Sequence, residues 1–435
     1  MPESLRLSFR DADFTSRFEA FVHQTRAPEN DVAARVSTII KDVRTKGDAA
    51  VLALTKQYDR QDLTPATMRV PQSEIEKAAA TLDKPVQAAL TLAAQRIRAF
   101  HEKQKPQDLR YQDEAGVILG AQWTPIEAAG LYVPGGAATY PSSVLMNAIP
   151  AQVAGVERLV MVVPTPDGIL NPTVLAAAHL AGVHEIYRIG GAQAIAALAY
   201  GTKTIAPVDM ISGPGNAYVA EAKRQIFGDV GIDMIAGPSE ILVVAAASAN
   251  PTWIAYDLLS QAEHDEVAQA ILICDDVAFA DAVSAAIETC LATLPRANIA
   301  RHSWQTYGAI FIVEDITKDA APLVNRLAPE HLELAVPDPD SYLPSIRHAG
   351  AIFLGQHTPE AVGDYIGGPN HILPTNRAAR YASGLSVLDF MKRSTLIGCD
   401  ADALAAIGGA ACTLAEAEGL DAHARSIAVR LNKKS

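Results

Sequence analysis

The chain has 435 residues, 49% of them hydrophobic, which is enough for two or three domains with substantial cores. Its formal net charge of -13 argues against nucleic acid and anionic membranes as partners, because both require clustered Lys and Arg side chains. The cysteines lack Cys-x-x-Cys spacing, the N-terminus lacks a signal-peptide core, and no apolar run is long enough to span a bilayer, so we expect a cytoplasmic protein.

Helical periodicity dominates the first part of the chain. Residues 1–24 are expected to form an N-terminal arm, and residues 31–104 carry apolar positions at helical spacing, as in 36–43 and 75–100. A segment rich in glycine and proline follows over residues 130–143. We expect a loop there, whose glycine pair lets a ligand approach the backbone closely.

Short strands and helices alternate from residue 159 onward, which predicts parallel sheets covered by helices. Gly237 and Pro238 mark the expected break between two sheets, and the helices before residue 130 are expected to pack with the later one. The expected strands are residues 159–163, 185–189, 208–211, 241–245, 270–274, 309–313 and 351–354. The expected helices are residues 172–182, 192–200, 216–227 and 278–291, with another that ends near residue 264.

The predicted fold class is therefore α/β, with two Rossmann-like parallel-sheet domains, an N-terminal arm and a small helical C-terminal unit. The pattern from Cys399 to the end is helical, but this unit is too thin to bury its apolar face alone. We expect it to dock on another domain or another subunit. The predicted segments are an arm (1–24), a discontinuous first domain with the candidate metal and catalytic residues (25–131 and 241–385), a second domain on the nucleotide side (132–240) and the C-terminal unit (386–435).

A possible metal site begins with Gln261 and His264, at the end of an apolar helical run. Residues three apart share one face of a helix, and a carboxamide oxygen beside an imidazole suits zinc or manganese. A Gln-x-x-His pair is, however, more often a solvated helix face. Further residues that could complete the site lie in a glycine-rich turn and in a C-terminal helical stretch: Asp364, His371, Glu418 and His423.

Glu330 and His331 form the second polar constellation. They follow Pro329, which favours a junction between a loop and a regular element. An adjacent carboxylate and imidazole would provide two proton acceptors at one site, although a surface turn with its charges in water is the more common reason for such a pair.

Two strand-to-helix turns are candidate ligand sites. Residues 212–218 have the context of a phosphate-binding turn, but Tyr218 occupies the third glycine position of the dinucleotide fingerprint. Residues 190–193 form a similar turn that could face a ligand at the carboxyl ends of the strands.

Taken together, these motifs resemble the histidinol dehydrogenase family, NAD-dependent enzymes of the last two steps of histidine biosynthesis. The resemblance covers nearly the whole chain from about residue 30, and its motifs are long and rare in combination. They are GLYVPGG (130–136), YPSSVLMNAIPA (140–151), GGAQAIAALAYGT (190–202), GPGNAYVAEAKRQ (213–225), AGPSEILV (236–243), SQAEHD (260–265), LAPEHLEL (327–334), GDYIGGPNHILPT (363–375), SGLSVLDFMKR (383–393) and EGLDAHARS (418–426).

The resemblance implies one zinc ion per subunit and NAD as cofactor. It also implies a homodimer in which His423 completes the metal site of the other subunit. The implied zinc ligands are Gln261, His264, Asp364 and His423; the implied contacts to L-histidinol are these four together with Ser239, His331, His371 and Glu418; and the implied contacts to NAD are Tyr132, Gln193 and Asn216.

The implied reaction is the four-electron oxidation of L-histidinol through L-histidinaldehyde to L-histidine. His331 would accept the hydroxyl proton, and Glu330 would then activate water for attack on the aldehyde. Two other classes fit the same residues. A zinc hydrolase would use Glu330 as its base and need no NAD, and a scaffold protein would keep the fold without catalysis.

Overall fold

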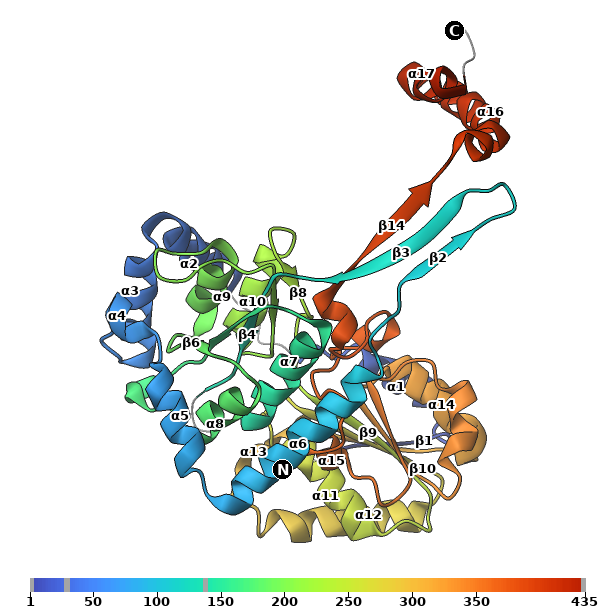
Figure 1. Ribbon diagram of the computed structural model, residues 1–435. Helices are drawn as coiled ribbons and strands as arrows, with labels where there is room; N and C mark the ends of the chain where they lie inside the picture. The colour runs from blue at the N-terminus through green and yellow to red at the C-terminus, as the bar shows by residue number, and fades with distance from the viewer. Residues whose placement is uncertain (1–3, 27–31, 136–139, 432–435) are drawn as a thin grey trace.

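The computed structural model describes residues 4–26, 32–135 and 140–431, so part of the predicted loop over residues 130–143 lies outside the described residues. Two parallel sheets with helices packed against them make up the body (Figure 1). A third, antiparallel sheet extends away from the body and carries a helical unit at its end. The predicted α/β class with two parallel sheets is confirmed.

The six-stranded sheet joins the N-terminus to the second half of the chain. Its strand order is β1-β11-β10-β9-β12-β13, and all neighbouring strands are parallel. Ile241 and Val243 face one apolar cluster, and Leu242 and Val244 face another on the opposite side of the sheet. The strands are β1 (Leu5–Ser8), β9 (Glu240–Ala245), β10 (Gln269–Cys274), β11 (Ala309–Ile312), β12 (His331–Ala335) and β13 (Ala351–Leu354).

Helices cover both faces of this sheet. Its helices are α1 (Phe14–Val22), α11 (Pro251–Ala262), α12 (Val277–Leu291), α13 (Ala297–Tyr307), α14 (Ile316–Leu327) and α15 (Glu360–Tyr365), with a 3₁₀ turn η2 (Pro339–Ser345). The described part of the first 24 residues, expected as an N-terminal arm, packs on this sheet. β1 is the edge strand beside β11, and Phe14 and Phe18 of α1 pack edge-on against Phe311. Burial of these rings holds the N-terminal segment on the sheet.

The five-stranded sheet has the order β6-β5-β4-β7-β8 and is also parallel throughout. Its strands are β4 (Ala128–Tyr132), β5 (Arg158–Val162), β6 (Glu185–Tyr187), β7 (Met210–Ser212) and β8 (Gly231–Ile232). Its helices are α7 (Pro141–Ala154), α8 (Pro172–Leu180), α9 (Gly191–Tyr200) and α10 (Ala217–Ile226), with a 3₁₀ turn η1 (Pro166–Gly168). The chain passes to the six-stranded sheet between β8 and β9, which agrees with the break expected at Gly237 and Pro238.

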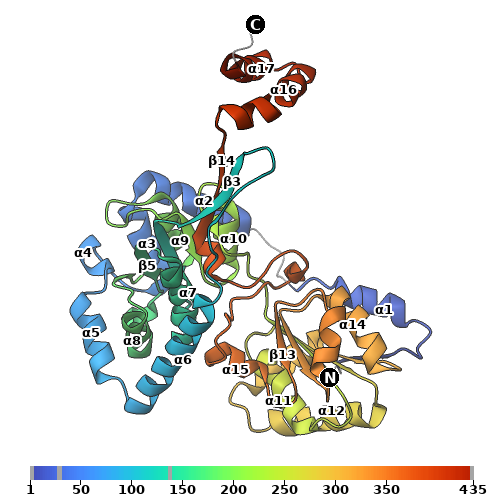
Figure 2. The ribbon, with the colours of Figure 1, turned by 45° about the vertical axis from the view of Figure 1, so that its right-hand side comes forward.

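The helices before residue 130 pack on the five-stranded sheet, so their predicted packing on the later sheet is wrong. Val36 and Val43 share a core with Ile195 of α9, and Ile75 and Ile97 share one with α7 and α8 (Figure 2). Helical periodicity shows which face of a helix is apolar, but not which sheet receives that face. These helices are α2 (Val32–Lys46), α3 (Asp48–Asp59), α4 (Pro65–Met68), α5 (Gln72–Thr81) and α6 (Lys84–Glu102).

The C-terminal unit stands away from both halves of the body (Figure 1). Its helices were expected, but the antiparallel ribbon β14-β3-β2 that carries them was not. The elements are β2 (Leu109–Gln112), β3 (Ile118–Pro125), β14 (Met391–Gly398), α16 (Ala401–Ala417), α17 (Asp421–Ala428) and the 3₁₀ turn η5 (Val429–Leu431); the 3₁₀ turns η3 (Ala378–Arg380) and η4 (Val387–Phe390) precede β14.

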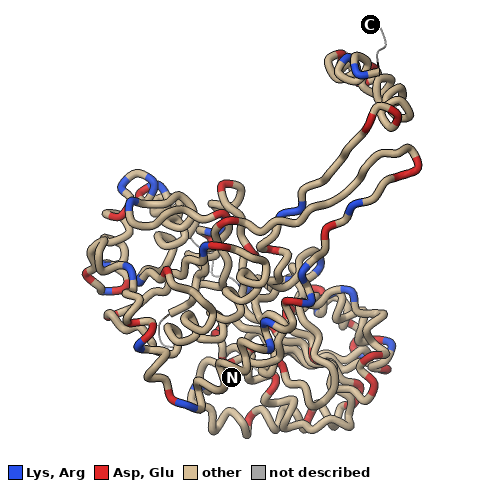
Figure 3. Tube along the Cα trace, in the orientation of Figure 1, with Lys and Arg blue, Asp and Glu red and all other residues tan. Residues whose placement is uncertain are grey.

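Acidic and basic residues are spread over both halves of the body (Figure 3). Within the described part of the chain, none of the helices combines the length and the hydropathy that a membrane span requires.

Candidate active site

The candidate catalytic residues lie at the amino-terminal edge of the six-stranded sheet. His331 begins β12, Glu330 precedes it, and Glu240 begins the neighbouring strand β9. The end of α11 and the short helix α15 reach the same edge, where Ser260 Oγ donates to Glu360 Oε2 at 3.3 Å. Two strand ends and two helices therefore meet at this edge of the sheet.

His331 has a defined tautomer. Its Nδ1 lies 2.8 Å from the backbone carbonyl oxygen of Glu240, and a carbonyl oxygen can only accept, so Nδ1 carries the hydrogen. Nε2 is then free to accept a proton, and it faces Glu360 Oε1 at 3.5 Å. Burial lowers the pKa of His331, which keeps the ring neutral and able to act as a base.

Glu330 is held by hydrogen bonds to Glu240, the first residue of β9. Its Oε2 accepts the backbone N–H of Glu240 at 2.9 Å, and its own N–H donates to Glu240 Oε2 at 3.3 Å. Burial, followed by the negative charge of Glu240, holds the pKa of Glu330 well above its usual range. A carboxyl group of raised pKa is a stronger base once it is ionised, which suits it to take a proton from water.

Among the His, Cys, Asp and Glu residues that the structure describes, one group could hold a metal ion. It comprises His331, Glu360 and Asp364, whose ligand atoms all lie within 4.8 Å of one another. Burial raises the pKa of Glu360 to about 7, and burial followed by the charge of Glu360 raises the pKa of Asp364 to about 6. A cation among these groups would favour their ionised forms.

Gln261 is the residue that fits a metal most clearly. Its side chain is 1% exposed, and its Oε1 has no hydrogen-bond partner. Such an oxygen is costly to bury unless something binds it. His264 lies just beyond the end of α11 and is exposed as a residue. Desolvation by the surrounding protein, followed by the charge of His331, lowers the pKa of its imidazole. A carboxamide oxygen, an imidazole and a carboxylate are ligands that zinc accepts, so these residues fit a divalent metal.

Two further predicted site residues, His371 and Ser239, lie next to residues of this edge. His371 Nδ1 lies 3.0 Å from the backbone oxygen of Asp364, and its Nε2 lies 3.3 Å from Ser143 Oγ on α7. The segment that runs from α15 to His371 therefore contacts the other half of the molecule. Ser239 immediately precedes Glu240, so it lies at the same strand edge as the proton acceptors.

The candidate nucleotide residues lie at the carboxyl edge of the five-stranded sheet. Tyr132 ends β4, and its hydroxyl accepts the N–H of Gly191 at 3.1 Å. Gln193 lies in the first turn of α9, and the side chain of Asn216 caps α10 by accepting the N–H groups of Tyr218 and Val219 at 3.1 and 3.2 Å. The chain runs outward in opposite directions from β4 and β7, which is the position where open α/β sheets bind nucleotides.

The glycine of the turn after β7 has a structural role. Gly213 has φ 111°, and a Cβ atom there would lie 2.0 Å from the backbone oxygen of Tyr132. The close approach of the two strand ends accounts for this glycine without a phosphate, so the motif over residues 212–218 is not in itself evidence for a nucleotide.

Two predicted site residues are not brought to the cluster within this chain. Glu418 and His423 are both exposed, at the junction of α16 and α17, and these helices lie at the outer end of the ribbon (Figure 1).

Sequence reasoning missed Glu360 and Glu240. Glu360 lies four residues before Asp364, a spacing that places both carboxylates on one face of a helix, and this signal was available. Glu240 is a charged residue at the start of the apolar run of β9, which is a second available signal because a buried charge needs a partner. The pair Glu333 and Asp257 had no such signal, because their contact joins β12 to α11.

Comparisons with known proteins agree over almost the whole chain. The family model of histidinol dehydrogenase matches residues 22–431. The chain is 61% identical over 429 residues to histidinol dehydrogenase of Rhodospirillum rubrum, covering 99% of each chain. It is 59% identical over 429 residues to that of Rhizobium meliloti, again covering 99% of each. A crystal structure of histidinol dehydrogenase from Elizabethkingia anophelis is 37% identical and superposes with a TM-score of 0.94 over 99% of each chain.

Proposed function

The chain belongs to the histidinol dehydrogenase family, and from this premise we propose that it oxidises L-histidinol to L-histidine in two NAD-dependent steps. The observation that carries the proposal is the pairing of His331, whose Nε2 is free to accept a proton, with the buried carboxyl group of Glu330. Oxidation of an alcohol to an acid needs a base for a hydroxyl proton and a base for water, and the two residues supply both.

In the first step His331 takes the hydroxyl proton of the alcohol at Nε2. The hydrogen on Nδ1 stays with the carbonyl oxygen of Glu240, which fixes the plane of the ring and stabilises the imidazolium that forms. NAD, when bound, accepts the hydride from the carbinol carbon. The product of this step is an aldehyde that stays in the site.

In the second step Glu330 takes a proton from the water molecule that adds to the aldehyde. Its backbone partner at Glu240 N holds one carboxylate oxygen, which leaves the other for water. His331 then takes the hydroxyl proton of the hydrate as the second hydride leaves, so it must release its first proton between the steps. In this mechanism His331 acts as a base in both steps, whereas Glu330 acts as a base in the second step alone.

We propose zinc as the resident metal, held by Gln261, His264 and Asp364 of one chain and by His423 of its partner. The unpartnered Oε1 of Gln261 and the crowded carboxylates at Asp364 and Glu360 support this assignment. Zinc at this place would supply an anchor for the amine and imidazole nitrogens of the substrate. Ser239, His371 and the partner's Glu418 are the proposed remaining contacts to the substrate.

We propose that Tyr132, Gln193 and Asn216 bind NAD. Their support is their position at the carboxyl edge of the five-stranded sheet. The segment after Asp364 of α15 carries His371, which contacts Ser143 of α7, and α7 follows β4. This contact between the two halves of the molecule supports a cofactor site near the proton acceptors. A cofactor there could present its ring to the substrate.

We propose a homodimer because the C-terminal unit buries few residues of its own. Leu414 of α16 is 66% exposed, and Leu420, which immediately precedes α17, is 42% exposed. A self-complementary pairing would cover these side chains and bring Glu418 and His423 to the partner's site.

The test follows NADH formation from limiting L-histidinol to completion. Two NADH per histidinol, lost after chelation and restored by zinc, is the expected result. One NADH per histidinol would mean that the aldehyde escapes or that Glu330 is misassigned, and it would refute the two-step oxidation. Turnover of an ester or amide without NAD would favour a metal-dependent hydrolase instead.

A further inference from the structure

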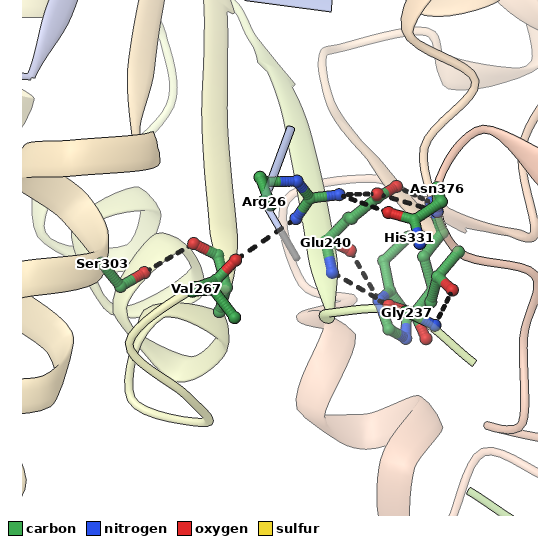
Figure 4. Close-up of polar contacts among 10 residues, drawn as sticks. Arg26, Gly237, Glu240, Val267, Ser303, His331 and Asn376 are labelled. Atoms are coloured by element: carbon green, nitrogen blue, oxygen red, sulfur yellow. Dashed lines mark hydrogen bonds and ion pairs between the residues drawn. The ribbon is translucent and has the colours of Figure 1, made fainter. Parts of the chain in front are cut away.

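A buried ion pair joins the N-terminal segment to the strand beneath the two proton acceptors. The guanidinium of Arg26, 8% exposed, pairs with the carboxylate of Glu240, 5% exposed (Figure 4). Arg26 Nη2 also donates to Asn376 Oδ1 at 3.4 Å, and its Nη1 donates to the backbone oxygen of Val267 at 3.5 Å. Two buried charges carry a desolvation cost, and the mechanism above uses neither of them.

The backbone of Glu240 holds both proton acceptors. Its N–H donates to Glu330 Oε2 at 2.9 Å, and its carbonyl oxygen accepts from His331 Nδ1 at 2.8 Å. A shift of this one peptide segment would therefore move the carboxylate and the imidazole together. Among the described residues, Glu240 alone forms hydrogen bonds to both side chains.

The side chain of Glu240 fixes that backbone in place. Its Oε1 accepts from Arg26 and from the N–H of Asn376 at 3.0 Å, and its Oε2 accepts from the N–H of Glu330 at 3.3 Å. Asn376 and Arg377 have φ angles of 51° and 63°, a conformation that residues with a side chain seldom adopt. The carboxylate thus connects three separate segments, one of which has an unfavourable backbone conformation.

We propose that the Arg26–Glu240 ion pair is a positioning device for the reaction, which holds Glu330 and His331 at the reacting distance through the backbone of Glu240. The inference rests on the proposed function of these two residues. Arg26 is suited to the task because its planar fork can reach Glu240, Asn376 and Val267 at once. The N-terminal segment, which carries no proposed catalytic group, then contributes to the active site.

The test compares Arg26→Met with Arg17→Met in the full-length enzyme. Arg17 lies on the same N-terminal segment, but it is exposed and pairs only loosely with Asp13 at 4.0 Å. Misplacing both acceptors should lower kcat about tenfold or more for histidinol and for histidinaldehyde alike, with KM for histidinol changed less than about twofold. Arg17→Met should leave both constants at wild-type values.

Arg26→Lys distinguishes the effect of lost positioning from the effect of lost charge, because lysine keeps the positive charge but lacks the planar guanidinium that reaches several partners. It should recover part of the kcat that Arg26→Met loses. A KM effect with unchanged kcat, a kcat for Arg26→Met within about twofold of the wild type, or no difference between Lys and Met at this position would overturn the proposal.

Arg26→Met leaves the Glu240 carboxylate buried without its partner and can fail to fold for that reason alone. The double variant Arg26→Met/Glu240→Gln removes both charges and keeps a hydrogen-bonding side chain at position 240. It should fold and show the same loss of kcat in both steps, and a wild-type kcat would overturn the proposal. If the wild-type enzyme forms no NADH from histidinol, the proposed function fails first and the positioning role fails with it.

Discussion

Replacement of Gln261 by methionine should have opposite effects on stability and on metal binding. In the metal-free protein the buried Oε1 of Gln261 has no partner, and leaving a polar group unsatisfied costs about 1–3 kcal/mol. Methionine has a similar shape without that oxygen, so the metal-free variant should be more stable than the wild type by about 1 kcal/mol. Zinc affinity should fall at least about tenfold, because even the loss of an outer-shell partner of a metal ligand has an effect of this size.

Two measurements on the same protein test this reasoning. Urea unfolding after chelation gives the free energy of unfolding of the metal-free protein, and competition with a fluorescent chelator gives the zinc affinity. Gln152→Met is the matched control, because Gln152 Oε1 accepts from Arg98 Nη2 at 2.7 Å. That variant should lose stability and keep its zinc affinity. If Gln261→Met destabilises the metal-free protein, or leaves zinc affinity unchanged, the assignment of Gln261 as a metal ligand is wrong.

Three further predictions follow from the same geometry. His331→Asn should lower the rates of both oxidation steps by a factor of about 10² to 10⁴, whereas Glu330→Gln should lower mainly the rate of aldehyde oxidation. Equal rate losses in the two steps for Glu330→Gln would contradict the assignment. Mixed dimers of His423→Asn and His331→Asn subunits should recover activity that neither homodimer has, and no recovery would exclude a shared site. Burial, followed by the charge of Asp257, raises the pKa of Glu333 to about 9, so ionisation of Glu333 destabilises the fold as pH rises from about 4.5 to 9. Unfolding of metal-free Glu333→Gln should therefore be less sensitive to pH in this window.

The sequence predicted the buried strands well, because burial on both faces leaves a continuous apolar run. β9 and β10 are buried along their whole length, and their expected bounds differ from the observed ones by one residue. The ribbon of β2 and β3 escaped prediction for the opposite reason. Every residue of β2 is exposed, so its sequence has no alternation from which a strand could be inferred.

The candidate site was predictable where its residues lie close together in the sequence. Gln261 and His264 share one helix end, and Glu330 and His331 are adjacent, so spacing made them candidates, although spacing alone favoured a solvated helix face and a surface turn. The contact between Arg26 and Glu240 joins residues 214 positions apart and depends on β1 and α1 packing beside β11. The sequence contains no local signal for such a pair, because only the tertiary fold brings the two residues together.

The C-terminal unit connects assembly with catalysis in the proposed dimer. β14 pairs with β3 over eight residue pairs, from Met391 with Pro125 to Gly398 with Ile118, so the ribbon fixes the direction in which α16 and α17 project. These helices bury Ala403, Ala415 and Ala424, which are small side chains and offer little apolar area to stabilise the unit alone. The interactions that hold the unit on a partner would be the same ones that deliver His423 to the partner's metal. Dissociation of the dimer should therefore remove a ligand from both sites at once, so that each subunit depends on the other for a complete site.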